Sequence, residues 1–418
     1  MRLTASYQNA NDLFHSVALL FVFFGRLNGM MLESDLAFLM VIGVSAVGIF
    51  LRIRVLWNMP KQYLFWLLGF LALYLLSASW AMNPSRTYTN FIATLGRMFV
   101  VLYAFSHMNS MDGIRKVVNT FLAAVVLNNI FIMVVFGPSA LIEVRTLEVV
   151  TKAGNNNGIG MSSAYAIILS WYLGDEQRRK KPLMLVVYAF LLLIVLLTGS
   201  KKALLILFLA VALMYFLTHK NKLTVVLVIA AVVAVGYFLL LNVPALYSLI
   251  GNRIESMVNG MISVLSLENL TANNLNNTSL NNSDRTRFYM ILRGLEWAKE
   301  RPLLGYGMAN YQDLFGTVTT KNMYSHNNYI EILVGMGIVG LCLYYLMYVS
   351  IIAKDCKNVR RSYHARVSLM LILLLLVLEI GLVSYLEIFT QITVGIATCL
   401  STKLVNSTNL EVKNDDAA

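Results

Sequence analysis

The sequence carries too little charge for a soluble globular protein of its length. Only 13% of its 418 residues are charged, whereas 58% are hydrophobic and the mean hydropathy is +0.68. This composition is typical of a protein that crosses a membrane several times. Its apolar runs are about 20 residues long, whereas the strands of an outer-membrane barrel have about ten residues. We therefore expect an all-α fold, a polytopic transmembrane helical bundle.

The sequence also lacks the residues and motifs of several kinds of site. Cys342 and Cys399 lie in apolar runs and Cys356 lies in a basic loop, so no pair is placed for an extracellular disulfide. The five histidines are scattered, and His-Glu-x-x-His, Asp-x-Asp and Cys-x-x-Cys motifs are absent. P-loop and dinucleotide motifs are absent as well. We expect no metal, no other cofactor and no nucleotide site on the cytoplasmic side.

The apolar runs predict about twelve membrane spans. Because the N-terminal ten residues are polar and no small-residue cleavage site follows the first run, we interpret that run as a span and not as a signal peptide. Arg26 weakens the first span, and the last two could form one bent hairpin. The predicted spans are residues 11–31, 36–55, 62–80, 89–107, 114–136, 157–174, 182–198, 200–218, 223–242, 325–353, 364–384 and 386–405.

Lysines and arginines indicate the orientation of these spans. Basic clusters follow spans 2, 4, 6, 8 and 10, so they share one face, which is cytoplasmic by the positive-inside rule. We therefore predict a protein of the bacterial inner membrane with both termini in the cytoplasm. Much of the net charge of +12 follows from this topology, and we expect no nucleic-acid partner. The clusters comprise Arg52, Arg54 and Lys61; Arg115 and Lys116; residues 178–181; Lys220 and Lys222; and Lys354, Lys357, Arg360, Arg361 and Arg366.

One long connection remains on the opposite, extracytoplasmic face. Its middle, residues 267–283, is rich in asparagine and has the composition of a flexible surface segment. Residues 285–299 then show helical periodicity, and Pro-Leu-Leu-Gly-Tyr-Gly at 302–307 ends it with turn chemistry. We expect short helices, one of them amphipathic, to cap this loop. The predicted division is therefore spans 1–9 in residues 1–242, the loop in 243–324, spans 10–12 in 325–405 and a cytoplasmic tail in 406–418.

Directly after this loop, a polar cluster runs into an apolar helix. Ser325 is a good N-cap, which predicts that His326 and Asn327 lie in the first turn of span 10. The positive end of the helix dipole would then disfavour the imidazolium and leave a neutral ring that can accept a proton. The alternative is that His326 only caps the helix, and that Gly337 and Gly340 only allow a neighbouring helix to approach.

Two pairs of cations lie on the outer face, although the positive-inside rule places lysines and arginines on the cytoplasmic face. Lys201 and Lys202 fall in the first turn of a helix, where the dipole repels cations unless an anion binds to the N-terminal amides. Otherwise their side chains would extend to the lipid headgroups. Arg285 and Arg287 come just before the expected cap helix, and their alternative is a solvated face balanced by nearby carboxylates.

A further arginine lies inside a span. A charge at the depth of Arg97, in span 4, costs about 2.5–3.5 kcal/mol, so a functional partner is the default hypothesis. The alternative is a structural ion pair with a carboxylate such as that of Glu379 or Glu387. Either way, the residue needs a partner that the apolar surroundings do not supply.

The residues around the histidine form a known pattern. His326-Asn327 is followed after nine residues by Gly337 and after two more by Gly340. This spacing resembles the histidine motif of the superfamily of O-antigen ligases and Wzy-type polysaccharide polymerases, which are polytopic membrane glycosyltransferases. The long outer loop before the motif is similar to the periplasmic loop of that family.

The loop carries a second element of the resemblance. Residues 302–307 look like the family's Pro-x-x-Gly-x-Gly turn, with Gly305 and Gly307 as its glycines. Arg287 lies fifteen residues before the proline, where the family usually carries an arginine. The similarity spans roughly residues 195–345, and the first half of the chain matches in hydropathy and span count alone.

A third element departs from the family pattern. Residues 200–205 are similar to the family's Ser-Arg-x-x-x-Leu segment, but Lys201 replaces the arginine. A lysine is a point charge that cannot hold a diphosphate bidentately. Whether Lys201 or Lys202 contacts the diphosphate therefore stays open.

The resemblance implies transfer of an oligosaccharide from a polyprenyl diphosphate to an acceptor hydroxyl, outside the cytoplasm and without metal or nucleotide. Cations would stabilise the leaving diphosphate, and His326 would act as the general base. The expected diphosphate-binding residues are Lys201, Lys202, Arg287, Arg285 and Arg97, and the expected supporting residues are Asn327, Glu331, Gly305, Gly307, Gly337 and Gly340.

The sequence leaves three reactions open. A polymerase would join lipid-linked repeat units into O-antigen, capsule or exopolysaccharide, and a ligase would transfer the finished chain to a lipid A core. We favour the polymerase because polymerases are the more diverse group, in which a lysine-substituted motif is less surprising. A lipid-linked oligosaccharide flippase is less expected, because it would need charges along many spans and no long outer loop. Besides donor, acceptor and membrane lipids, a flippase and a chain-length regulator are the expected partners.

Overall fold

The structure is a computed structural model and describes residues 2–27, 35–137, 156–242, 283–319, 322–385 and 387–404. All regular elements in these ranges are helices, which confirms the all-α prediction. The asparagine-rich run and the C-terminal tail lie outside the described residues, apart from Ser283. The division of the chain into spans, loop and tail therefore stays a prediction.

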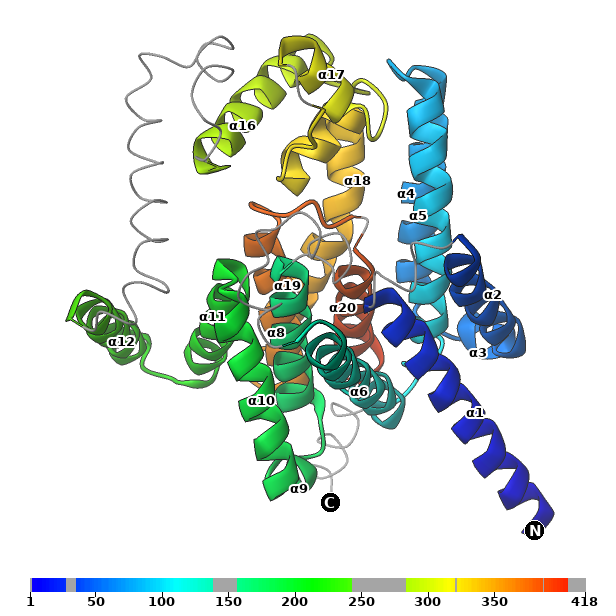
Figure 1. Ribbon diagram of the computed structural model, residues 1–418, viewed down its shortest axis with the longest axis vertical. Coiled ribbons are helices and arrows are strands. Elements are labelled where there is room, and N and C mark those ends of the chain that lie inside the picture. Colours follow the sequence, from blue (N-terminus) through cyan, green and yellow to red (C-terminus); the bar gives the residue numbers. More distant parts are fainter. Residues whose placement is uncertain are drawn as a thin grey trace.

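The helices follow one another closely along the chain (Figure 1). The first part contains α1 (Arg2–Leu27), α2 (Asp35–Leu51), α3 (Ile53–Trp57), α4 (Lys61–Leu76), the 3-10 turn η2 (Ser77–Ser79), α5 (Pro84–Phe105) and α6 (Met111–Phe136). The middle part contains α8 (Asn156–Leu173), α9 (Glu176–Arg179), α10 (Pro182–Thr198), α11 (Lys201–Thr218) and α12 (Lys222–Asn242). The last part contains α16 (Ser283–Glu300), α17 (Tyr311–Val318), α18 (Asn328–Asn358), α19 (Tyr363–Leu378), α20 (Ile388–Cys399) and the π-helical turn η5 (Leu400–Leu404).

Each of the twelve segments predicted as spans contains a helix. By length and apolarity, six of the described helices can cross a membrane, and four further apolar helices are shorter. The six segments are Ala10–Leu27, Lys61–Ser79, Pro84–Phe105, Met111–Phe136, Lys201–Thr218 and Asn328–Asn358. These helices make the chain a membrane protein, whereas the count of twelve spans stays a prediction.

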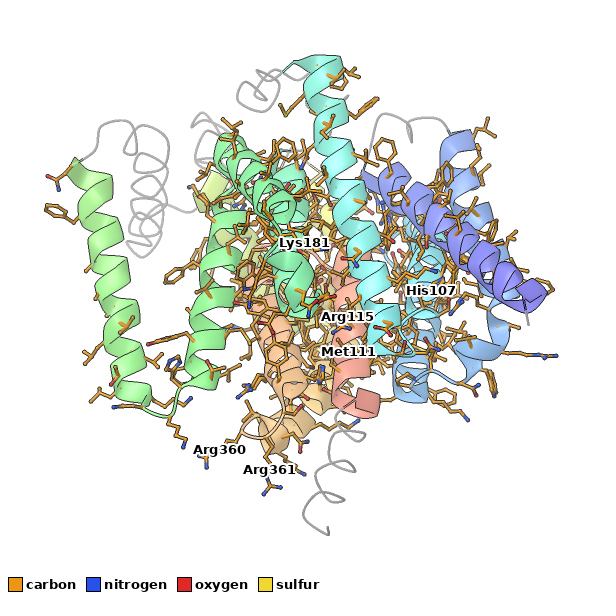
Figure 2. All side chains as sticks on the ribbon, turned by 90° about the horizontal axis from the view of Figure 1, so that it is seen from below. His107, Met111, Arg115, Lys181, Arg360 and Arg361 are labelled. Carbon is orange, nitrogen blue, oxygen red and sulfur yellow. The ribbon has the colours of Figure 1, made fainter. Side chains whose placement is uncertain are left out.

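The two ends of the bundle differ in character. The amphipathic helix α16 and the short helix α17 cover the upper end in Figure 1, and α4 and α5 rise beside α18 to the same level. Arg115, Lys181, Arg360 and Arg361 lie on the face seen from below (Figure 2). The structure thus gathers three of the basic clusters at the end opposite to the cap, as the orientation requires. Its assignment to the cytoplasm rests on the positive-inside rule.

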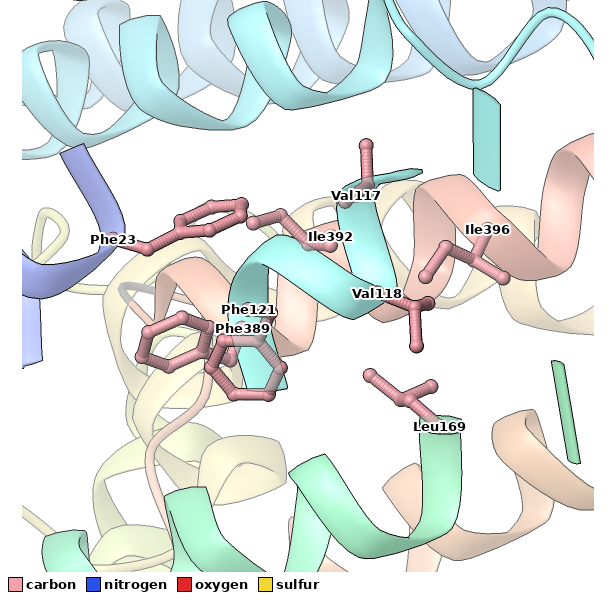
Figure 3. Close-up of a pocket in the computed structure, with 8 residues that line it drawn as sticks. All are labelled: Phe23, Val117, Val118, Phe121, Leu169, Phe389, Ile392 and Ile396. Atoms are coloured by element: carbon pink, nitrogen blue, oxygen red, sulfur yellow. The ribbon is translucent and has the colours of Figure 1, made fainter. Parts of the chain in front are cut away.

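An apolar core holds the helices together. Rings from α1, α6 and α20 meet around a narrow pocket, where the centroids of Phe121 and Phe389 are 4.6 Å apart and those of Phe23 and Phe121 are 5.9 Å apart (Figure 3). Leu169 of α8 closes another side of the pocket. All eight residues that line it are apolar, so we interpret it as a packing feature of the core.

Candidate functional site

Helix α18 begins two residues after the histidine and not at it. The side chain of Asn327 accepts the N–H of Ile330 at 3.0 Å, so Asn327 is the N-cap and the helix starts at Asn328. His326 therefore lies just outside the helix, in the left-handed region with φ +55°. The prediction that Ser325 is the N-cap was wrong because asparagine and serine cap helices about equally well. The Ser325 hydroxyl instead donates to the Asn327 carbonyl at 2.7 Å.

The imidazole of His326 is neutral for a different reason than the helix dipole. Burial, together with the positive charges of Arg287 and Lys202, lowers the pKa of His326 to about 4. A ring with such a pKa is uncharged near neutral pH and can accept a proton. A bound diphosphate would offset the two cations, so that the histidine would become more basic when the donor is in place.

Lys202 is the lysine of the pair that lies at this site. Gly199, with φ +56°, ends α10, and the Ser200 hydroxyl accepts the N–H of Ala203 at 3.4 Å, so that α11 starts at Lys201. The Lys202 ammonium donates to the carbonyl of Gly381, and its charge acts on His326. Successive helix positions are about 100° apart, so Lys201 points in another direction.

Arg287 approaches the histidine from the outer cap. It lies in α16, which begins at Ser283, so Arg285 and Arg287 are part of the cap helix and do not precede it as predicted. Arg287 is half-buried, and its charge acts on His326 and on Tyr324. The side chain of Arg285 lies outside the described residues. The structure thus brings His326, Lys202 and Arg287 together from three elements.

Arg97 has a different environment. It is half-buried in α5, and its charge acts on Tyr74, Tyr385 and Arg26. Within the described residues, no ion pair joins Arg97 to Glu379 or Glu387, although both carboxylates are described. The two ion pairs named as examples of the structural alternative are therefore not formed, and Arg97 stays a predicted anion ligand.

Glu379 is instead the centre of a buried hydrogen-bond network that sequence reasoning missed. It is fully buried, and its carboxylate accepts hydrogen bonds from the hydroxyls of Tyr345 and Tyr348, each at 2.8 Å, and from Ser384. Its carbonyl accepts the N–H of Asn328 at 2.9 Å. These donors satisfy a carboxylate that would otherwise be costly to bury.

The connection between α19 and α20, residues 379–387, holds both halves of the site. The Asn327 amide donates to the carbonyl of Ile380 at 3.0 Å, and Lys202 donates to the next carbonyl, that of Gly381. Asn328 accepts the N–H groups of Ser384 and Tyr385 at 2.9 and 3.1 Å. Because these partners are backbone groups, no residue type in the sequence indicated the connection.

Glu331 supports the loop before the histidine. It is 3% exposed, and its carboxylate accepts the N–H of Ser325 at 2.9 Å. This bond fixes the residue that precedes His326. The supporting role of Glu331 in the reaction stays a prediction.

The motif glycines form a junction between the turn at 302–307 and a break in α18. Gly337, with φ +61°, interrupts the helix, so that backbone groups on both sides of it lose their helical partners. The turn supplies those partners and thereby ties the outer cap to α18. The bonds run from Tyr306 N–H to Val334 O at 2.8 Å, from Gly307 N–H to Gly335 O at 2.9 Å and from Ile338 N–H to Pro302 O at 2.8 Å.

This junction has no room for side chains. A Cβ at Gly337 would lie 2.2 Å from the carbonyl oxygen of Leu303, and a Cβ at Gly305 would lie 2.4 Å from that of Val334. A Cβ at Gly307 would likewise collide with Ala81, and a Cβ at Gly340 would collide with Met336. The four glycines therefore allow close packing, but Gly337 packs against the turn and Gly340 against Met336 of its own helix, not against a neighbouring helix.

We predict that Gly337→Ala destabilises the protein strongly. An alanine must adopt φ +61° and collide with the turn, which together costs about 1–3 kcal/mol or more. Thermal unfolding of the purified protein in detergent measures the effect. Gly43→Ala is the matched control, because no atom lies within 4 Å of a Cβ built at Gly43 in α2. Equal melting temperatures for both variants would contradict the junction.

The first half of the chain also holds the cap in place. Asn310, just after the glycine turn, is fully buried; it accepts the N–H of Asn83 at 2.6 Å and donates to the Thr87 hydroxyl at 2.7 Å. Arg86 forms an ion pair with Asp313 at 2.7 Å. The end of the connection between α4 and α5 and the first turn of α5 are therefore part of the support of the site, although the sequence resemblance does not extend to them.

Comparison with known families agrees with this geometry. Residues 184–345 match the family model described as O-antigen ligase. The match contains Lys201, Lys202, Arg287 and His326, and it confirms the resemblance predicted from the histidine motif. A search of curated proteins finds no match to the chain.

Proposed function

We propose that this membrane protein, whose residues 184–345 carry an O-antigen ligase domain, transfers glycan from a polyprenyl-diphosphate-linked donor to an acceptor hydroxyl on the extracytoplasmic side. The observation that carries the proposal is the neutral, half-buried His326 on which the charges of Arg287 and Lys202 act. A base beside two cations is the arrangement that such a transfer needs.

The three residues divide the chemistry between them. Arg287 and Lys202 bind the diphosphate and stabilise the negative charge that it gains as its bond to the anomeric carbon breaks. The acceptor hydroxyl attacks that carbon, and its proton moves to the imidazole of His326. Asn327 and Glu331 keep the histidine in place, because both hold the segment at 325–328 by hydrogen bonds.

We further propose that the reaction is polymerisation of lipid-linked repeat units into a surface polysaccharide, with ligation to a lipid A core as the alternative. A deletion strain distinguishes the two by the banding of its surface glycan. We expect a band of a single repeat unit, because the polymer cannot form. Accumulation of lipid-linked polymer, with a lipid A core that carries no polymer, would indicate the ligase. Repeat units confined to the cytoplasmic leaflet would indicate a flippase.

The topology that this function requires has a direct test. A cysteine introduced by Asn276→Cys, in a background without Cys342, Cys356 and Cys399, should react with an impermeant maleimide in spheroplasts. Asn276 lies outside the described residues, in the predicted outer loop. Arg361→Cys on the opposite face is the control and should react only after lysis (Figure 2). Labelling of Asn276→Cys only after lysis would contradict the extracytoplasmic position of the site.

A further inference from the structure

Tyr324 is an exposed aromatic residue beside the histidine. Its side chain is 45% exposed although Ser325, the next residue, is buried. The ring centroids of Tyr324 and His326 are 4.1 Å apart, with 46° between the planes. An aromatic ring that is left open to solvent at a candidate catalytic base offers an apolar face of the size of a sugar ring.

A carboxylate lies on the same side of the histidine. Glu387 is exposed at the N-cap of α20, and within the described residues its carboxylate neither caps the helix nor accepts another hydrogen bond. Its N–H donates to the carbonyl of Ser384 at 2.9 Å, and the N–H of Ser384 in turn donates to Asn328, two residues after the histidine. Burial and the charge of Glu387 raise the pKa of Tyr324, so the charge of Glu387 acts at the Tyr324 ring.

The chemistry of this side suits a sugar and not a phosphate. A pyranose has an apolar C–H face, which packs on an aromatic ring, and hydroxyls at its edge, which donate to a carboxylate. The diphosphate is attracted by Lys202 and Arg287, whereas the charge of Glu387 repels it. Arg287 acts on Tyr324 as well as on His326, whereas Lys202 acts on His326, so the donor's diphosphate is drawn toward Lys202 and away from Glu387.

We infer that Tyr324 and Glu387 form a subsite for the acceptor glycan, in which a terminal pyranose stacks on the Tyr324 ring and presents one hydroxyl to His326. The inference rests on the proposed function and adds where the acceptor lies. The Tyr324 ring centroid lies 4.1 Å from that of the imidazole that takes the proton, so a sugar on Tyr324 lies next to the base. Tyr324 and Glu387 thereby act as specificity-determining residues for the acceptor.

Binding of a glycan tests the subsite without any turnover. The probe is the oligosaccharide repeat unit released from the native surface glycan, added to purified protein in detergent and followed by saturation-transfer NMR. We expect transfer to the C–H protons of one sugar face with wild type and a clear loss with Tyr324→Leu, which keeps an apolar side chain but not the ring. Tyr88→Leu is the matched control, because Tyr88 is 50% exposed near the outer end of α5. Equal signals for both variants, or no signal with wild type, would overturn the subsite.

Separate KM values for donor and acceptor then show whether the sugar bound at Tyr324 belongs to the acceptor. In an elongation assay that varies the released repeat-unit oligosaccharide as acceptor at a fixed concentration of lipid-linked donor, and then the reverse, Tyr324→Leu should raise the KM for the acceptor about threefold to tenfold, the range of aromatic pair energies. Glu387→Gln should raise it about tenfold. Tyr324→Phe should stay close to wild type, and the KM for the donor should not change with any of them. A rise in the donor KM, or a fall in kcat alone, would overturn the assignment. Absence of elongation by wild type would instead contradict the proposed function. The NMR result would then still show whether Tyr324 binds a glycan.

Discussion

His326→Ala is expected to lower the rate of glycosyl transfer by about 10²–10⁴-fold and to leave binding of the lipid-linked donor almost unchanged. The donor is held through its diphosphate by Arg287 and Lys202, whereas the imidazole acts only when the acceptor hydroxyl loses its proton. The assay uses protein purified in detergent with a lipid-linked repeat unit and follows elongation on a gel. His219→Ala is the matched control, because His219 is exposed at the far end of α11. Full elongation by His326→Ala would show that another group is the base.

The pH dependence of the wild type gives a second measurement of the same role. The pKa of His326 is lowered to about 4, so the ring stays neutral as pH falls from 8 to about 5 and is protonated only near pH 4. We therefore expect kcat/KM to be flat over that range and to fall below it. Burial of the ring is the main cause of this value, followed by Arg287 from α16 and Lys202 from α11, while the Tyr324 ring lies at 46° to the imidazole with its centroid 4.1 Å away. In the donor complex the diphosphate offsets the cations, so the fall in kcat should occur at higher pH than the fall in kcat/KM.

The fold could be predicted from the sequence because the thickness of a bilayer sets the length of an apolar helix. Helices are present in all twelve predicted segments, and α16 matches the amphipathic segment expected in the outer loop. The start of α18 was wrong by two residues, since Ser325 and Asn327 are both good caps and only tertiary contacts decide between them. The break at Gly337 was not predicted either, because glycine spacing indicates close approach but not an interrupted helix.

Site residues could be predicted from the sequence where their charge is unusual for their position in the membrane topology, and not where their type is ordinary for an apolar helix. Lys202 and Arg287 could be predicted as site residues because cations are unexpected on the outer face. In the structure the charges of both act on His326. Tyr345 and Tyr348, which bind Glu379, look like ordinary members of an apolar helix. Their role depends on a carboxylate about thirty residues away, and no local pattern reports such a contact.

Arg287→Ala is expected to lower kcat/KM by about 10²-fold, with a higher KM for the donor as well as a lower kcat. A diphosphate is charged in the ground state and gains charge in the transition state, so a cation that binds it contributes to both. One charge-assisted hydrogen bond is worth about 1.5–3 kcal/mol, which corresponds to roughly tenfold to a hundredfold. Arg287→Lys should recover part of the loss, because it restores the charge but not the planar donor pair.

The pH profile distinguishes a cation at the site from one that only supports the fold. Removing a positive charge near a histidine raises its pKa, so Arg287→Ala and Lys202→Ala should both shift the fall in kcat/KM to higher pH. Because burial is the largest cause of the low pKa of His326, we expect a partial shift toward the ordinary value and not a complete one. Lys201→Ala, one position away in the same helical turn, should shift the profile less than Lys202→Ala. An equal shift for Lys201→Ala and Lys202→Ala would mean that Lys202 is not the lysine that faces the histidine. An unchanged pH profile for Arg287→Ala would mean that Arg287 of the cap helix does not act on His326.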